Sequence, residues 1–91
     1  MSVYFVYILE VIDKSGKKMF YTGYTNNLYR RWKEHGNGAG AKFCRGKRRE
    51  LRYFEIFSSK KEAMKRELEI KTFSRQKKRD LIDNIKDIQN S

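Results

Sequence analysis

Cysteine, histidine and proline are scarce or missing in this chain. Of its 91 residues, one is cysteine and one is histidine, and proline does not occur. A single cysteine cannot form an intramolecular disulfide, and one cysteine with one histidine cannot complete a structural zinc site. These counts exclude a disulfide-stapled secreted scaffold and a zinc-binding domain of the Cys/His type.

Long apolar segments are also missing. The longest apolar run, residues 3–9, has seven residues, whereas a membrane-spanning helix needs about 20. The N-terminus lacks the basic stretch and the small-residue cleavage site that mark a signal peptide. We therefore expect a cytosolic (cytoplasmic) chain with no membrane partner.

Acidic residues are outnumbered two to one by basic ones. Lys and Arg total 22 against 11 Asp and Glu, which gives a net charge of +11 and a pI near 10.0. Hydrophobic residues make up 38% of the chain and aromatic residues 14%, too many core formers for a disordered basic tail. The composition predicts one folded basic domain over residues 1–91 whose partner is a polyanion, with nucleic acid the commonest.

The pattern of apolar residues predicts the element order β-β-α-β-α-α. Residues 3–9 are β-branched and aromatic without polar alternation, as in a central strand buried on both faces. A turn follows, then an antiparallel strand at 19–22, and a third strand is expected at 51–57. Helices are expected over about 28–35, 60–72 and 75–89, the second of them capped by Ser58 or Ser59. The fold class is therefore α+β, with a small sheet covered by helices.

The basic residues fall into two clusters, one at 42–52 and one at 75–79. Evenly spread solubilising charge would alternate in sign, as it does over 60–71. Clusters of one sign raise the local potential and release counterions when they meet phosphates, although a merely solvated basic surface is the alternative. The residues expected to contact a nucleic-acid backbone are Lys42, Arg45, Lys47, Arg48, Arg49, Arg52, Arg75, Lys77 and Lys78.

Glu67 stands where an apolar residue is expected. It shares one face of the 60–72 helix with Ala63, Met64 and Leu68, which the pattern predicts to be the core-facing side. A carboxylate beside a core costs several kcal/mol unless it is paired or bound to a metal. Two readings stay open: an i,i+4 ion pair with Lys71, or a metal ligand.

Arg31, Tyr7 and Tyr21 are further polar residues that the pattern places beside apolar ones, and each has a structural and a functional interpretation. Arg31 shares a helix face with apolar residues: it is either an ordinary solvated arginine or an inward one that complements an inward carboxylate or faces a phosphate. His35, one turn further on, is more typical of packing or capping. Tyr7 and Tyr21 fall on strands that the predicted hairpin makes neighbours, and they are either ordinary core tyrosines or a pair whose hydroxyls have a task.

Two short motifs at this spacing resemble the two-part signature of the GIY-YIG nuclease superfamily. They are Phe5-Val6-Tyr7 and, thirteen residues later, Tyr21-Thr22-Gly23. Residues 24–35 are similar to the arginine-bearing helix of that family, and residues 62–67 are similar to its glutamate-bearing helix. The resemblance covers about residues 4–82 and is strongest to small single-domain bacterial members, which are similar to the catalytic module of structure-specific endonucleases.

This resemblance implies a three-stranded antiparallel sheet flanked by helices, and hydrolysis of DNA phosphodiester bonds with one Mg²⁺ or Mn²⁺ ion. It implies that Glu67 is the protein ligand of the metal, with waters completing the octahedron. Tyr7 or Tyr21 would act as general base or orient the attacking water. Arg31 would stabilise charge on the phosphoryl oxygens, and His35 would assist the base or hold phosphate. DNA repair or recombination is the process such an activity would serve.

The chain also departs from the family signature. Phe5 replaces a glycine and Thr22 an isoleucine, whereas Gly23, where the backbone must pass close, is kept. The asparagine that many relatives carry after the glutamate helix has no placed counterpart, and we expect a protein partner to supply specificity because no second domain is expected. The alternatives are a non-catalytic nucleic-acid-binding module with the same fold and a small basic accessory protein that docks on an acidic partner.

Overall fold

The computed structural model describes residues 2–36 and 48–90. In this part of the chain the elements follow the predicted order β-β-α-β-α-α. They are β1 (Tyr4–Ile12), β2 (Lys18–Thr25), α1 (Leu28–Gly36), β3 (Arg48–Phe57), α2 (Lys60–Lys71) and α3 (Arg75–Asn90). The helices match the predicted ranges within a residue or two at each end, whereas every strand is longer than predicted. The strands are longer because their ends carry charged and polar residues, which an apolar pattern leaves out.

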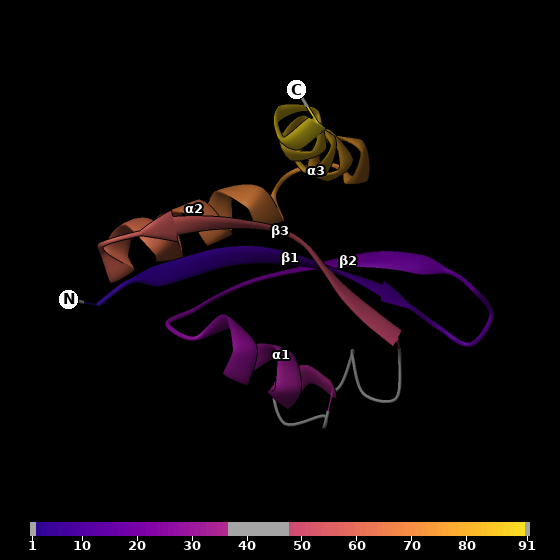
Figure 1. Ribbon diagram of the computed structural model, residues 1–91, viewed down its shortest axis with the longest axis horizontal. Coiled ribbons are helices and arrows are strands. Elements are labelled where there is room, and N and C mark those ends of the chain that lie inside the picture. The colour runs from indigo at the N-terminus through magenta and orange to yellow at the C-terminus, as the bar shows by residue number, and fades with distance from the viewer. Residues whose placement is uncertain (1, 37–47, 91) are drawn as a thin grey trace.

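The three strands form one antiparallel sheet in the order β2-β1-β3. This confirms both the α+β class and the central position predicted for the first strand. Figure 1 shows α2 and α3 on one side of the sheet and α1 on the other, so that β1 is covered on both faces. Residues Val6 to Val11 of β1 are accordingly all buried.

Alternate side chains of β1 build two separate apolar clusters. On the side of α2 and α3, Val6 and Ile8 pack with Ala63, Ile70 and Ile82. On the other side, Tyr7, Leu9 and Val11 form a second cluster against which Tyr21 and Leu28 pack. The period of two along a strand thus assigns Tyr7 and Tyr21 to the side of α1.

The hairpin between β1 and β2 is held by an aspartate. Asp13 Oδ1 accepts hydrogen bonds from the backbone N–H groups of Ser15 and Lys17, each at 2.9 Å. Gly16 adopts φ of 88°, a left-handed conformation that glycine reaches without steric cost. This turn fixes the register in which Tyr7 lies opposite Gly23.

The sequence pattern misplaces the buried face of α2. Met64 and Leu68, predicted to face the core, are 41% and 62% exposed, whereas Ala63 and Ile70 are fully buried. The helix is turned this way because Arg66 reaches β3, where its Nε donates to Glu55 at 2.9 Å. At the start of the helix, Ser59 rather than Ser58 is the N-cap and accepts from the backbone N–H of Glu62.

Candidate active site

Tyr7 is a buried tyrosine whose ring lies against a glycine. Its side chain is 2% exposed, on the α1 side of β1, and its cross-strand neighbour is Gly23. A Cβ atom on Gly23 would lie 2.5 Å from the hydroxyl oxygen of Tyr7 and 2.7 Å from its Cζ. Only the absence of a side chain at position 23 therefore leaves room for the phenol.

Tyr21 lies diagonally across the strand pair from Tyr7. It is paired with Leu9, two residues along β1, and so occupies the same face of the sheet. Its ring is half-buried and packs on the cluster that contains Tyr7. The two tyrosines are thus brought together by the hairpin, and the charge on an ionised Tyr21 raises the pKa of Tyr7.

Arg31 reaches the same point from α1. The first turn of this helix is capped by Asn27, whose Oδ1 accepts from the backbone N–H of Arg30 at 2.9 Å. Arg31 is half-buried, whereas its neighbours Arg30 and Lys33 are exposed. Its guanidinium donates a hydrogen bond to the phenol of Tyr7 and, as a cation, lowers the pKa of that group.

Glu67 approaches from α2. Its side chain is 14% exposed, and Lys71 Nζ lies 3.5 Å from its Oε1. The i,i+4 ion pair is therefore formed, but it leaves a carboxylate that is largely shielded from water. The negative charge of Glu67 is close enough to Tyr7 to raise the pKa of its phenol.

These four side chains bring a cation, a carboxylate and two phenols together from β1, β2, α1 and α2. The pKa of Tyr7 is raised from its ordinary 10.0 to about 12, first by burial and then by the charges of Tyr21 and Glu67, against the opposing effect of Arg31. Tyr7 is therefore protonated near neutral pH and can donate a hydrogen bond. His35 lies on α1, but its side chain is outside the described part of the structure.

The donor set fits a magnesium ion better than a transition metal. Within residues 2–36 and 48–90 no three His, Cys, Asp or Glu side chains gather as a metal cage. Mg²⁺ is commonly held by one or two carboxylates together with waters and substrate phosphates. Glu67, largely shielded from water and ion-paired with Lys71, has the chemistry of such a single carboxylate ligand.

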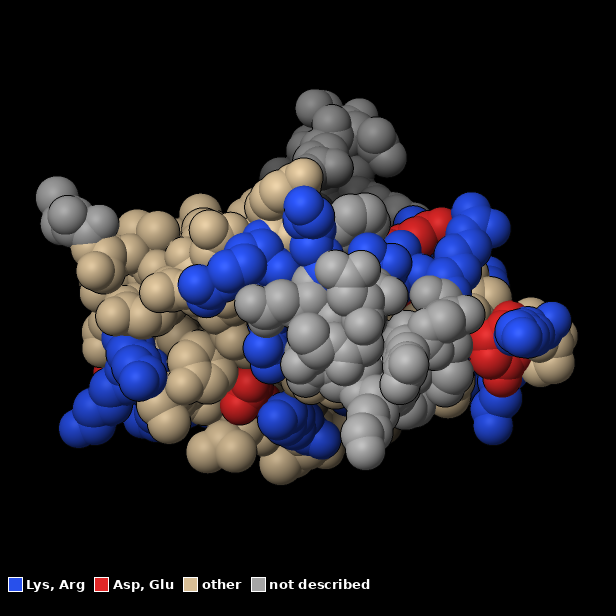
Figure 2. All heavy atoms as spheres, turned by 90° about the horizontal axis from the view of Figure 1, so that it is seen from below, with Lys and Arg blue, Asp and Glu red and all other residues tan. Residues whose placement is uncertain are grey.

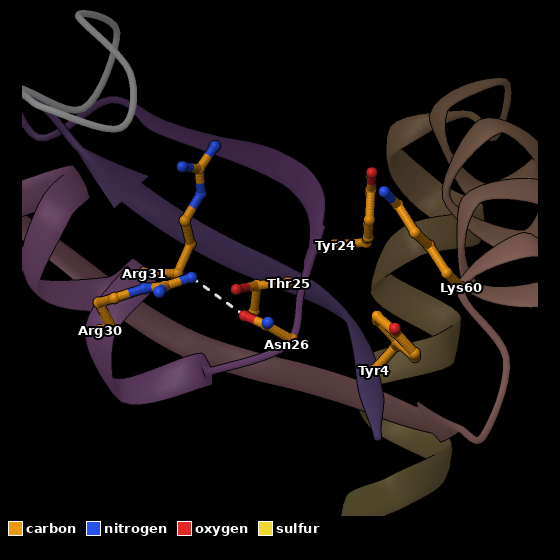
Figure 3. A pocket seen from close by; sticks show the side chains of 7 residues that line it. All are labelled: Tyr4, Tyr24, Thr25, Asn26, Arg30, Arg31 and Lys60. Atoms are coloured by element: carbon orange, nitrogen blue, oxygen red, sulfur yellow. Dashed lines mark hydrogen bonds between the residues drawn. The ribbon is translucent and has the colours of Figure 1, made fainter. Parts of the chain in front are cut away.

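A pocket of about 340 Å³ opens next to Arg31 (Figure 3). Arg30 and Arg31 line it from α1, Lys60 lines it from the first turn of α2, and Tyr4 and Tyr24 line it from the strands. Sequence reasoning missed Tyr4, Tyr24 and Lys60. The only sequence signal for this pocket was that Tyr4 and Tyr24 stand near the ends of their strands. The pocket itself could not be predicted, because the strand ends, α1 and the start of α2 are distant in sequence and meet only when the sheet has formed.

The described residues of the first predicted basic cluster lie on both faces of the sheet, because Arg49 pairs with Val11 on the α1 side whereas Arg52 lines a pocket with Ile82 on the α3 side. Figure 2 shows Lys and Arg side chains spread over the face seen from below, the α1 side, with Asp and Glu in few places. Of the first cluster, Lys42, Arg45 and Lys47 lie outside the described residues, while Arg48, Arg49 and Arg52 lie on β3. Arg52 is committed to Glu10, which is 5% exposed, with Nη2 at 2.9 Å from Oε1.

The second cluster belongs to α3, on the opposite side from α1 (Figure 1). Arg75 lies over the ring of Phe20, and Lys77 Nζ lies 4.1 Å from the ring centroid of Phe73. Lys78 is half-buried, and burial lowers the pKa of its ammonium group. These cations therefore already have packing roles on α3.

None of the helices in the described part of the chain is long and apolar enough to span a membrane.

The fold and the gathered side chains define a known class of domain. The chain belongs to the GIY-YIG family, because the family model of the GIY-YIG catalytic domain matches residues 3–80.

Within that family the chain is similar to small proteins named UPF0213. The UPF0213 protein SH2523 of Staphylococcus haemolyticus is 49% identical over 84 residues, 91% of this chain and 98% of that protein. The UPF0213 protein CPE1444 of Clostridium perfringens is 48% identical over 81 residues, 88% of this chain and 83% of that protein. The solution NMR structure of the UPF0213 protein BH0048 from Bacillus halodurans is 43% identical, with a TM-score of 0.51 over 89% of this chain and 83% of that chain.

Proposed function

We propose that this protein is a metal-dependent endonuclease that hydrolyses phosphodiester bonds in DNA in the cytoplasm, in the service of DNA repair or recombination. The observation that carries the proposal is that the buried phenol of Tyr7 has the guanidinium of Arg31 as a hydrogen-bond partner and also experiences the charge of the Glu67 carboxylate. A GIY-YIG catalytic domain in the family match is consistent with it.

In this proposal Arg31 and Tyr7 act as one unit on the phosphodiester. Water attacks the phosphorus in line with the P–O bond that breaks, negative charge builds on the phosphoryl oxygens, and a proton passes from the attacking water, by way of solvent, to the leaving oxygen. Arg31 neutralises that charge, and its hydrogen bond to Tyr7 holds both side chains in place. Since the pKa of Tyr7 is about 12, roughly one phenol in 10⁵ is ionised at pH 7, so Tyr7 acts by orienting the attacking water.

Glu67 supplies the metal-binding carboxylate. Glu67 would hold a Mg²⁺ or Mn²⁺ ion, which would supply Lewis-acid stabilisation of the charge that develops on the phosphodiester. The ion pair between Arg66 and Glu55 ties α2 to β3, which supports a carboxylate at position 67 that is ordered before substrate binds. Tyr21 and His35 are assigned supporting roles, Tyr21 by packing next to Tyr7 and His35 by its place on α1.

Substrate contact is assigned to the basic residues Lys42, Arg45, Lys47, Arg48, Arg49 and Arg52, with Arg75, Lys77 and Lys78 as a second surface on α3. Contact with the phosphate backbone carries little sequence information. We therefore propose that a protein partner supplies specificity beyond the shape of the DNA.

The test is a nicking assay on labelled duplex, branched and single-stranded DNA with Mg²⁺, Mn²⁺ or EDTA. Glu67→Gln should lower the cleavage rate about a hundredfold or more because the metal ligand is lost. Glu69→Gln is the matched control, since Glu69 lies two residues further on α2 and its carboxylate is half-exposed. Arg31→Ala should likewise abolish cleavage, whereas Lys33→Ala, exposed on the same helix, should not.

Folding of each variant is checked by circular dichroism. Cleavage retained in Glu67→Gln, or cleavage that continues in EDTA, would contradict the site. Salt-dependent DNA binding without cleavage by the wild type in every condition would support the alternative, a nucleic-acid-binding module with a GIY-YIG fold.

A further inference from the structure

The pocket beside Arg31 lies at the end of the sheet, between the two helical layers. Figure 3 shows Arg30 and Arg31 on the α1 side and Lys60 with Tyr24 on the α2 side. Arg31 is shared with the candidate active site, so a group in this pocket is next to the phosphodiester on which Arg31 would act. The pocket is therefore an extension of that site along the substrate.

The charges around the pocket favour an anion. Arg30, Arg31 and Lys60 contribute three positive charges, and the described residues that line it include no Asp or Glu. Arg30 is oriented toward the pocket wall because its Nη2 donates to Asn26 Oδ1 at 3.0 Å, drawn as a dashed line in Figure 3. A phosphate between α1 and α2 would meet cations from both sides.

The size and the aromatic walls favour one nucleotide. A volume of about 340 Å³ is near the lower end of the roughly 300–1,000 Å³ of small-molecule pockets, and it is far too small for a duplex. Tyr4 and Tyr24 are both half-buried, and both pack against the core cluster on the α2 and α3 side of the sheet. Rings fixed in this way offer stacking surfaces for a base, and stacking tolerates any base.

We propose that this pocket holds one unpaired nucleotide of the DNA substrate, adjacent to the bond that is cut. Its phosphate lies against Arg30 and Lys60, and its base lies against Tyr24. The inference rests on the proposed function and names its substrate class: DNA with an unpaired nucleotide, such as a flap or a single strand, in preference to continuous duplex. In continuous duplex each base is paired and stacked, and moving one into the pocket requires unstacking it.

The test is equilibrium binding, measured by fluorescence anisotropy in EDTA. The probes are a labelled blunt duplex and the same duplex with a short unpaired flap. We expect the wild type to bind the flap DNA about tenfold more tightly, in line with stacking of one base. Because EDTA removes the metal, the result does not depend on cleavage, and a failure of the Glu67 experiment leaves it interpretable.

Two variants with a matched control locate the preference. Tyr24→Leu removes the ring but keeps apolar bulk against the core, and it should abolish the preference for the flap. Lys60→Ala should weaken flap binding and reduce the slope of log affinity against log salt by about 0.7–0.9. Lys61 is the next residue of α2, is exposed and lies outside the pocket. Lys61→Ala should therefore keep the preference for the flap and the wild-type slope of log affinity against log salt.

Several outcomes would overturn the inference. Equal affinity of the wild type for the two DNAs would do so, as would a full flap preference in folded Tyr24→Leu. An equal loss of affinity for the flap DNA and the blunt duplex in Lys60→Ala would also overturn the inference, because it would mean that Lys60 attracts any DNA backbone and does not bind the unpaired nucleotide. If Tyr24→Leu fails the circular dichroism check, Lys60→Ala against Lys61→Ala decides the question.

Discussion

Replacing Gly23 by alanine tests how the candidate active site is built. The new Cβ would lie 2.5 Å from the hydroxyl oxygen of Tyr7 and 2.7 Å from Cζ, whereas non-bonded atoms prefer about 3.5 Å or more. The phenol would have to move by about 1 Å. Tyr7 is 2% exposed and packed in the cluster of Leu9 and Val11, so the ring cannot swing away without disturbing its neighbours.

The magnitude follows from two opposing effects. Overpacking of a core costs about 1–3 kcal/mol. Alanine in place of glycine gains about 0.4–1 kcal/mol by restricting the unfolded chain, and the gain applies because the φ of Gly23 is not positive. The net loss of unfolding free energy is about 1–2 kcal/mol, which lowers Tm by about 5–15 °C for a domain of this size. Urea and thermal unfolding followed by circular dichroism measure it.

A double-mutant cycle identifies the cause. In a Tyr7→Leu background the ring is gone, so Gly23→Ala should cost nothing or become slightly stabilising. Gly16→Ala is the contrasting variant: the space around Gly16 is open but its φ is 88°, so its cost should be the same in both backgrounds. A Gly23→Ala protein as stable as the wild type, or an equal cost with and without the Tyr7 ring, would refute the reasoning.

Three further predictions concern charged and titrating groups. The folded protein holds the phenolic proton of Tyr7 more tightly than the unfolded chain does, because the pKa of Tyr7 is about 12 in the folded protein against an ordinary value of 10.0. This stabilisation is complete below pH 10 and is lost as the pH rises toward 12, at about 1.4 kcal/mol per pH unit. Tyr7→Phe should remove this part of the pH dependence of the unfolding free energy, measured by urea unfolding. Arg52→Ala leaves the Glu10 carboxylate, 5% exposed, without its guanidinium and should destabilise by about 2–4 kcal/mol in chemical unfolding, whereas replacing both residues by leucine should cost much less. Lys71→Ala removes the cation 3.5 Å from Glu67 and should tighten Mg²⁺ binding by about two- to fivefold in calorimetric titration, and weaker binding would contradict the role of that carboxylate.

The element order and the central strand could be read from the sequence because local chemistry decides them. The apolar stretch around Val6 has no polar alternation, which only a strand covered on both faces tolerates. The turn residues around Asp13 force the next strand to return beside it, and the structure uses that aspartate in the turn. Period and turn chemistry are thus sufficient for the sheet.

The orientation of α2 could not be read in the same way. Leu68 was predicted to face the core because it is apolar, yet it is exposed, while the arginine at position 66 lies toward the sheet. That arginine is accommodated only because Glu55 of β3 and the hydroxyl of Tyr53 form a polar network with it. Such a partner, distant in sequence, leaves no trace in the helical pattern of the segment itself.

The candidate site was partly accessible from sequence. The motifs around Tyr7, Arg31 and Glu67 point to one another only through their resemblance to a family, and their convergence depends on the sheet register and on both helical layers. The pocket wall at Tyr24 and Lys60 gave no motif at all, because those residues meet across the end of the sheet.

The central strand β1 is made before the other two strands of the sheet, and its two edges form their backbone hydrogen bonds at different times. β1 pairs with β2 through a short hairpin, but with β3 it pairs Tyr4 to Phe57, and closing that longer loop has a larger entropic cost. We expect one edge of β1 to stay open until β3 has been made. Tyr7 then meets Gly23 early, and the carboxylate of Glu67 joins them last, so that a nascent chain holds the phenol in place before α2 has been made.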